Sequence, residues 1–148
     1  MSTPNEADFA LIKMGDGGGT EVFTAICGIE NVSINNAVQT SDRTRRDCAK
    51  PGKIGTRKIK ATGKTQTITG SGGVDKANIA SFDTALGLVK NYKVELYKYD
   101  GTDTGLLYGT YAGAYMMTSS NMSFDPNGDS SGEITLESDG SWTWTAAS

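Results

Sequence analysis

The sequence contains no histidine, and this absence bears on both catalysis and metal binding. Histidine is the commonest general base of enzymes and a frequent ligand of zinc. Most of the acidic residues fall in turn segments, where carboxylates ordinarily hydrogen-bond to the backbone. Nothing in the chain meets the criteria for a catalytic centre. We therefore expect no enzymatic activity, no bound metal and no cofactor.

Cysteine and long apolar runs are also scarce. Two cysteines, Cys27 and Cys48, are too few for a disulfide framework. We expect Cys27, which lies in an apolar run, in the core, and we assign no role to Cys48, which lies among charges. No window of eighteen apolar residues is present, and the first residues do not resemble a signal peptide. We expect a protein that is cytosolic when made and has no membrane span.

Only three prolines accompany nineteen glycines and many Thr and Ser residues, a composition typical of short strands joined by tight turns. The 148 residues fit one domain. The apolar fraction of 36% predicts a modest core, so that partner surfaces could supply further burial. We expect a mainly β fold in which residues 1–8 form a polar N-terminal arm that orders on a partner.

Local patterns predict seven or eight strands and one helix. The helix is expected within residues 74–90, with Asp75 as N-cap and a stripe formed by Ile79, Phe82, Leu86 and Val89 at steps of three and four. The segment 106–124 is expected to form one long bulged strand or two short ones. The remaining strands are expected at residues 9–13, 21–27, 31–38, 57–70, 92–99 and 133–137 and around Trp142 and Trp144, and the first two form a hairpin.

Charge is segregated along the chain. Residues 41–64 hold nine basic and two acidic residues, a net charge of +7, so the rest of the chain carries −10 within a total of −3. No Lys or Arg follows Lys98, whereas seven acidic residues do. Residues 39–56 show no periodicity and are predicted to form a long loop, and a structureless segment of that length in a small domain tends to be functional or disordered.

The basic segment has three possible interpretations. It could be a solvated surface loop, or it could bind nucleic acid or an acidic partner, although no aromatic residues are interleaved for base stacking. It could also contact the acidic surface of a second copy, which predicts a head-to-tail polymer. The basic candidates for that contact are Arg43, Arg45, Arg46, Lys50, Lys53 and Arg57. The acidic candidates are Asp100, Asp103, Asp125, Asp129 and Glu133.

The order of segments resembles that of a known family. DFALIK is followed by a glycine turn, EVFTAICGIENVSINN, a loop containing TSD, TITGSGGVDKANIASFD and an acidic β-rich end. Over roughly residues 8–140 this layout resembles the major tail proteins of long-tailed phages and gene transfer agents, the tail tube family. The resemblance implies an antiparallel β-sandwich-like or barrel-like subunit with one flanking helix. Residues 38–56 match by position the family's long inter-strand loop, which reaches neighbouring subunits.

The same resemblance implies a function. Subunits would close as hexameric rings around a DNA channel, and the rings would stack into the tube of a virion tail. The expected partners are other copies of the chain, the tape measure, tail terminator and distal tail proteins, and DNA in non-specific passage. The lumen tends to be acidic in this family, so the acidic candidates above are also lumen candidates. Lys93 and Lys98 depart from that pattern and leave open which strands line the channel. A subunit of a related effector-injection tube remains an alternative.

Overall fold

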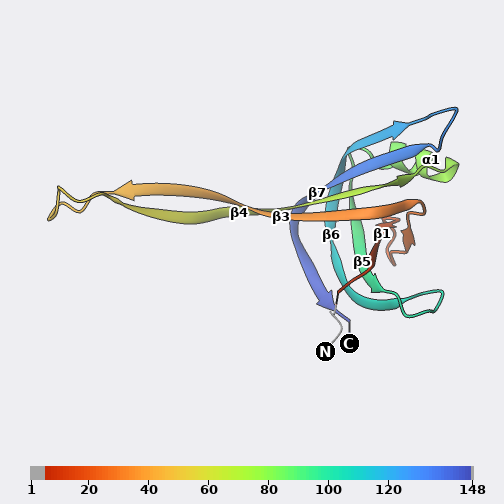
Figure 1. Cartoon of the computed structure of the whole chain (residues 1–148), viewed down its shortest axis with the longest axis horizontal. Helices are drawn as coiled ribbons and strands as arrows, with labels where there is room; N and C mark the ends of the chain where they lie inside the picture. The colour runs from red at the N-terminus through yellow and green to blue at the C-terminus, as the bar shows by residue number, and fades with distance from the viewer. Residues whose placement is uncertain (1–5, 148) are drawn as a thin grey trace.

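The computed structural model describes residues 6–147, which form seven strands and one helix (Figure 1). All seven strands join one antiparallel sheet in the order β2-β1-β5-β6-β7-β4-β3. This confirms the predicted mainly β, antiparallel fold with one helix. The elements are β1 (Phe9–Gly15), β2 (Phe23–Ala25), β3 (Ile29–Arg45), β4 (Thr56–Gly73), α1 (Lys76–Ala85), β5 (Val89–Lys98), β6 (Leu106–Ser123) and β7 (Ser131–Ala146).

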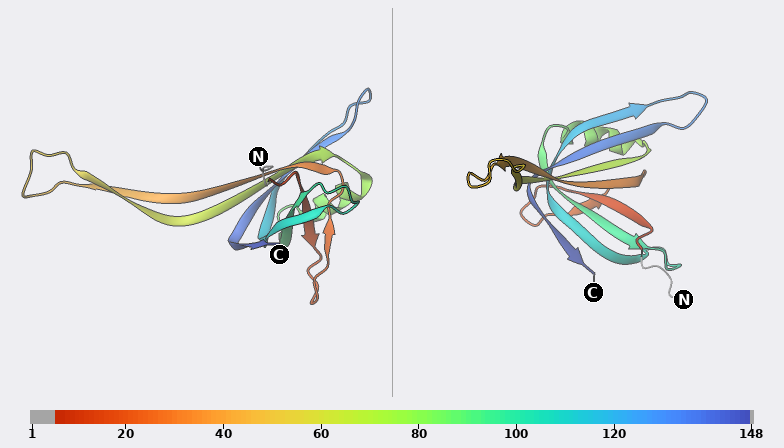
Figure 2. Two further views of the ribbon diagram at one scale, coloured as in Figure 1. Left: turned by 60° about the horizontal axis from the view of Figure 1, so that its bottom comes forward. Right: turned by 60° about the vertical axis from the view of Figure 1, so that its left-hand side comes forward.

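The sheet curls so that β1 approaches β3 and β4 across the core, which gives the body a barrel-like form (Figure 2). The approach is close at Gly70 of β4. A Cβ atom there would lie 2.7 Å from Ile29 Cγ2 and 2.9 Å from Ile12 Cδ1, distances that no side chain tolerates without a shift of its neighbours. The core side chains include Ile12, Ile29, Ile68, Phe82, Tyr92, Val94, Tyr115, Met117, Ile134 and Leu136.

The helix begins where the sequence predicts and ends earlier. The Asp75 side chain accepts hydrogen bonds from the backbone N–H groups of Ala77 (2.7 Å) and Asn78 (3.4 Å), which confirms it as the N-cap. Of the predicted apolar stripe, Phe82 is buried. Ile79, Leu86 and Val89 are 36%, 45% and 46% exposed, so the stripe as a whole was wrong. The helix ends at Ala85, which takes the core position nearest its end, and Val89 already belongs to β5.

Cys27 is exposed, and its predicted place in the core was wrong. Its neighbour Ile26 occupies the core instead, with 6% exposure. Cys27 lies beyond the end of β2, in the turn that leads to β3, where its side chain faces outward. Gly28 follows with a φ of +94°, a conformation that favours glycine, and it turns the chain into β3.

Nearly half of the predicted loop 38–56 is strand. β3 continues to Arg45 and β4 begins at Thr56, so only residues 46–55 lie outside strands, and the two strands project from the body as a long hairpin (Figure 1). Exposure on both faces removes the alternation by which a strand is recognised, which is why the sequence indicated a loop. The segment 106–124 forms one strand, β6, with register shifts.

Part of the expected N-terminal arm, residues 1–5, lies outside the described residues. The Asp8 backbone N–H donates to the Tyr97 carbonyl (2.8 Å), and its carboxylate accepts from the Tyr99 backbone N–H (2.9 Å). Asp8 therefore lies along the end of β5. Among residues 6–147, no helix has the length and apolar character that crossing a membrane would require.

Candidate functional site

The outer part of the β3–β4 hairpin is a two-stranded ribbon. We call residues 40–61 the distal ribbon, with residues 46–55 as its tip. Its strands pair from Thr40 with Ala61 to Arg45 with Thr56, whereas β7 joins β4 only from Thr67 onward. Every residue of the distal ribbon except Gly55 is exposed. The ribbon therefore buries almost no surface of its own, and two-stranded hairpins without a packed face are marginal in water.

Positive charge covers the strands of the distal ribbon. Arg43 lies directly opposite Lys58, and like charges at paired positions destabilise a sheet. Arg57 Nε lies 2.9 Å from Asp42 Oδ2, but both side chains are more than half exposed, so this ion pair contributes at most about 1 kcal/mol. The basic side chains therefore weaken the isolated ribbon.

The tip holds three more of the predicted basic residues, Arg46, Lys50 and Lys53, all exposed. Two consecutive backbone turns order it, since the Lys50 N–H donates to the Asp47 carbonyl (3.0 Å) and the Lys53 N–H donates to the Lys50 carbonyl (3.1 Å). The tip also carries Ile54, which is 98% exposed and which the sequence analysis did not single out.

The five predicted acidic candidates are also exposed, at the ends of strands of the body. Asp100 and Asp103 lie in the β5–β6 turn, Asp125 and Asp129 lie in the β6–β7 turn, and Glu133 lies in β7. Asp100 accepts from the Thr102 N–H (2.9 Å) and from the Thr102 hydroxyl, and these bonds lower the pKa of its carboxyl. Asp125 accepts from the Asn127 N–H at 2.9 Å. Both carboxylates thus shape their turns as well as carrying charge.

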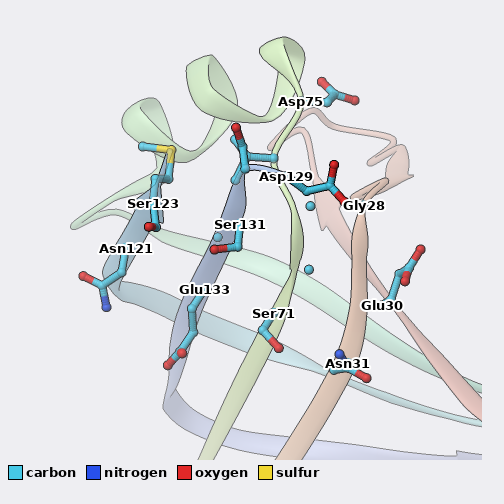
Figure 3. Close-up of a pocket in the computed structure, with 16 residues that line it drawn as sticks. Gly28, Glu30, Asn31, Ser71, Asp75, Asn121, Ser123, Asp129, Ser131 and Glu133 are labelled. Atoms are coloured by element: carbon cyan, nitrogen blue, oxygen red, sulfur yellow. The ribbon is translucent and has the colours of Figure 1, made fainter. Parts of the chain in front are cut away.

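Two of these acids belong to a larger feature, an open groove of about 990 Å³ that we call the acidic groove (Figure 3). Asp129 and Glu133 line it together with Glu30 and Asp75, and none of the described residues that line it is basic. Figure 3 shows Glu30 on β3 and Glu133 on β7 on either side of Ser71 on β4. Among the described residues, no three acidic or cysteine side chains gather closely enough to hold a metal ion.

The sequence alone gives no sign that Glu30 belongs to this groove, and it indicates Asp75 only as a helix cap. Glu30 and Glu133 are about a hundred positions apart in the chain, and they come together because β7, β4 and β3 are neighbours in the sheet. The strand ends that carry the groove residues, and the acidic turns, lie on the side of the body away from the tip (Figure 1). A single chain cannot bring its tip to its own acidic groove, so contact between them requires two copies arranged head to tail.

No protein-family model matches the sequence, and no curated protein matches it. Solved structures do match the fold. The tail of an empty gene transfer agent particle with C6 symmetry contains a chain 23% identical, with a TM-score of 0.64 over 92% of this chain and 95% of that one. A chain of the anti-feeding prophage baseplate is 15% identical, with a TM-score of 0.67 over 99% and 98%. A chain of the SPP1 tail tube is 12% identical, with a TM-score of 0.59 over 93% and 76%.

These similarities extend over nearly the whole chain. At such low identity they establish architecture. The chain has the fold found in chains of a gene transfer agent tail, of the anti-feeding prophage baseplate and of the SPP1 tail tube, the tail tube fold.

Proposed function

We propose that this protein is the structural subunit of a virion tail tube, and not an enzyme. Copies would assemble head to tail, with the basic distal ribbon of one copy against the acidic side of the body of another. The observation that carries this proposal is that the basic side chains lie on the distal ribbon and the acidic groove lies on the body, two parts of the molecule that the ribbon view shows far apart (Figure 1). Opposite charges on separate surfaces favour a heterologous contact, and such contacts propagate into rings or stacks.

The strand pairing supports closure into rings. β7 pairs with β4 only up to Glu137, and its remaining residues pair with β6 alone. The described pairings of the β4 residues before Thr67 are all with β3. Each subunit thus carries backbone edges that a neighbouring copy can pair, and open edges promote association. We propose six subunits in each ring, as the resemblance implies, and the gene transfer agent tail with this fold has C6 symmetry.

Within that assembly the protein would be a passive conduit for DNA, with tape measure, tail terminator and distal tail proteins as further partners. Lys93, which departed from the expected acidic lumen, has its Nζ 4.3 Å from the centroid of the Phe23 ring and so has a partner within the chain. A tube that delivers effectors is the second candidate, since a contractile injection system supplies a further chain with this fold, at 21% identity and a TM-score of 0.61.

Electron microscopy of the concentrated protein tests the proposal, and we expect rings and stacked tubes. The triple variant Arg43→Glu, Arg45→Glu, Arg46→Glu should remain folded, because its charges lie outside the core, and should form no tubes. The matched control, Arg43→Lys, Arg45→Lys, Arg46→Lys, keeps the charge and should polymerise. Normal tubes from the Glu variant would contradict the proposed role of the ribbon. Wild-type protein that stays monomeric at all concentrations and binds duplex DNA instead, with steep salt dependence, would favour a nucleic-acid binding module.

A further inference from the structure

The distal ribbon carries a large apolar side chain where none is expected. Ile54, at the tip, has the greatest exposure of the large apolar side chains in the described part of the chain, 98%. Isoleucine is among the residues most often buried in proteins. Next to Ile54 the two strands of the hairpin approach closely, because a Cβ atom on Gly55 would lie 2.9 Å from the Arg45 carbonyl oxygen. Ile54 is therefore presented at the far end of the hairpin, next to Lys53.

The body carries an unfilled apolar groove. It has a volume of about 340 Å³ and lies between α1 and the end of β6. Ile79 and Leu86 are exposed to 36% and 45%, and Met122 of β6 is exposed to 40%. We call this groove between α1 and the end of β6 the helix groove. Ile79 and Leu86 are two of the four side chains in the apolar stripe that the sequence predicts on the helix. The lining residues are Lys76, Ile79, Ala80, Phe82, Asp83, Leu86, Ser120 and Met122.

The helix groove adjoins the acidic groove. Met122 lines both, Asp75 of the acidic groove precedes Lys76 of the helix groove, and Asp83 borders the helix groove itself. The surface is thus an apolar hollow with carboxylates beside it. The tip is its complement, an apolar knob with Lys50, Lys53 and Arg46 around it. The two surfaces are matched in apolar character and, apart from Lys76 at the helix groove and Asp47 at the tip, they are opposite in charge.

From this match we propose that the helix groove of one copy receives Ile54 of a second copy, so that the basic side chains of the tip lie against the acidic groove. The inference rests on the proposed function and names the contact that joins one copy to the next. The occupant is a second copy because the tip projects away from the body and cannot reach its own helix (Figure 1). The contact is heterologous, and each copy offers one tip and one groove.

Paired substitutions test the contact. Ile54→Ser removes the knob, and Leu86→Ser makes the hollow polar. Since an isoleucine side chain that moves from water into an apolar site gains affinity by a factor of about 10 to 100, each variant should raise the critical concentration for polymerisation by about that factor. The matched control is Val22→Ser, which alters an exposed valine (59%) between β1 and β2, outside the distal ribbon and both grooves, and should assemble as the wild type does. Thermal unfolding should be unchanged in all three.

Mixing gives a sharper test, because the two halves of the contact lie on different copies. Ile54→Asp keeps an intact groove and Leu86→Asp keeps an intact tip. Neither should stack alone, and the mixture should form a species of twice the mass of either, measured by sedimentation. Failure of the mixture to form that species would overturn the pairing of tip and groove.

The outcomes separate the two proposals. Wild-type protein that forms no rings or tubes would contradict the proposed function and this contact with it. Tubes that form normally from Leu86→Ser would contradict only the proposed role of the helix groove, and the tube proposal would stand.

A disulfide experiment measures the contact directly. In tubes of a Cys27→Ser, Cys48→Ser background, Ile54→Cys with Met122→Cys should form an intermolecular disulfide on mild oxidation, whereas Ile54→Cys with Val22→Cys should not.

Discussion

At the scale of residues, a small buried network fixes the root of the hairpin. Gln66 of β4 is fully buried, although glutamine is mostly exposed in proteins. Its side-chain oxygen accepts from the Tyr115 hydroxyl, its side-chain nitrogen donates to Asn36 Oδ1 (2.8 Å), and its backbone N–H donates to Ser138 Oγ (3.0 Å). Gln66 pairs with Asn36 across the hairpin, one residue before β7 joins β4. These bonds anchor the point where the hairpin leaves the body.

Tyr92 lies beside this network and differs from Tyr115 in one respect. The two rings meet edge to face, with centroids 6.2 Å apart. The Tyr92 hydroxyl is buried and has no hydrogen-bond partner among the described residues. Burial raises the pKa of Tyr92 to about 12, so its hydroxyl remains a protonated donor without an acceptor at neutral pH. An unsatisfied buried hydroxyl lowers the stability of the fold.

The two tyrosines therefore respond differently to removal of the hydroxyl. We expect Tyr115→Phe to lower the free energy of unfolding by about 1–3 kcal/mol, because it leaves Gln66 Oε1 buried without its donor. Tyr92→Phe should leave this free energy unchanged or raise it by up to about 1 kcal/mol. Urea denaturation of the purified variants measures both values. Equal losses from the two substitutions would contradict this difference and would show that the Tyr92 hydroxyl is hydrogen-bonded as the Tyr115 hydroxyl is.

At the scale of elements, the hairpin divides into a rooted half and a distal ribbon. In the proximal half, β4 pairs with β7 as well as with β3. Ile68 lies in the core and Ile34 packs against it. The distal ribbon pairs only within itself among the described strands. Burial on folding, the main source of stability, is therefore supplied by the proximal half.

Shortening the hairpin tests this division. We expect that replacing residues 41–60 by Asn-Gly, a dipeptide suited to a two-residue hairpin turn between Thr40 and Ala61, leaves a folded body with a melting temperature within a few degrees of the wild type. The shortened chain should form no stacks. Circular dichroism and sedimentation measure the two properties. Loss of the folded body would mean that the distal ribbon stabilises the subunit as well as the assembly.

The same division explains which elements the sequence could reveal. β5 buries Tyr92 and Val94 on one face, and that alternation made the strand recognisable. Asp75 was found because an N-cap is a local signal. The distal ribbon packs neither face, so its strands carried no alternation. Ile79 and Leu86 follow a helical period yet remain exposed, because a period shows that a face exists and does not identify what covers it.

The candidate site was predictable in its parts but not in its arrangement. The excess of basic residues near Arg43 and of acids after Lys98 is visible in the sequence. The acidic groove is not, because Glu30, Asp75, Asp129 and Glu133 come from segments that only the strand order brings together. Charge segregation along the chain became separation in space because the two strands of the hairpin carry the basic segment away from the body (Figure 2).

At the scale of the whole molecule, separated charges predict a dependence on salt. Exposed charges are screened over about 10 Å at 0.1 M salt and about 3 Å at 1 M. We expect the critical concentration for polymerisation to rise as sodium chloride is increased, while the melting temperature of the subunit changes little, since its core is apolar. Sedimentation across a salt series provides the measurement. Assembly that is indifferent to salt would show that apolar contacts alone join the copies.

The lack of packing around the distal ribbon has a consequence for backbone chemistry. Amide protons exchange with solvent when local structure opens, and opening is easy where few apolar contacts hold the strands. In the lone subunit, residues 40–61 should take up deuterium long before β4 does at Ile68 or β5 at Val94, both of which are fully buried. Once a second copy covers the ribbon, deuterium uptake by residues 40–61 should slow. Isotope labelling of this one segment therefore reports the fraction of ribbons that contact a second copy.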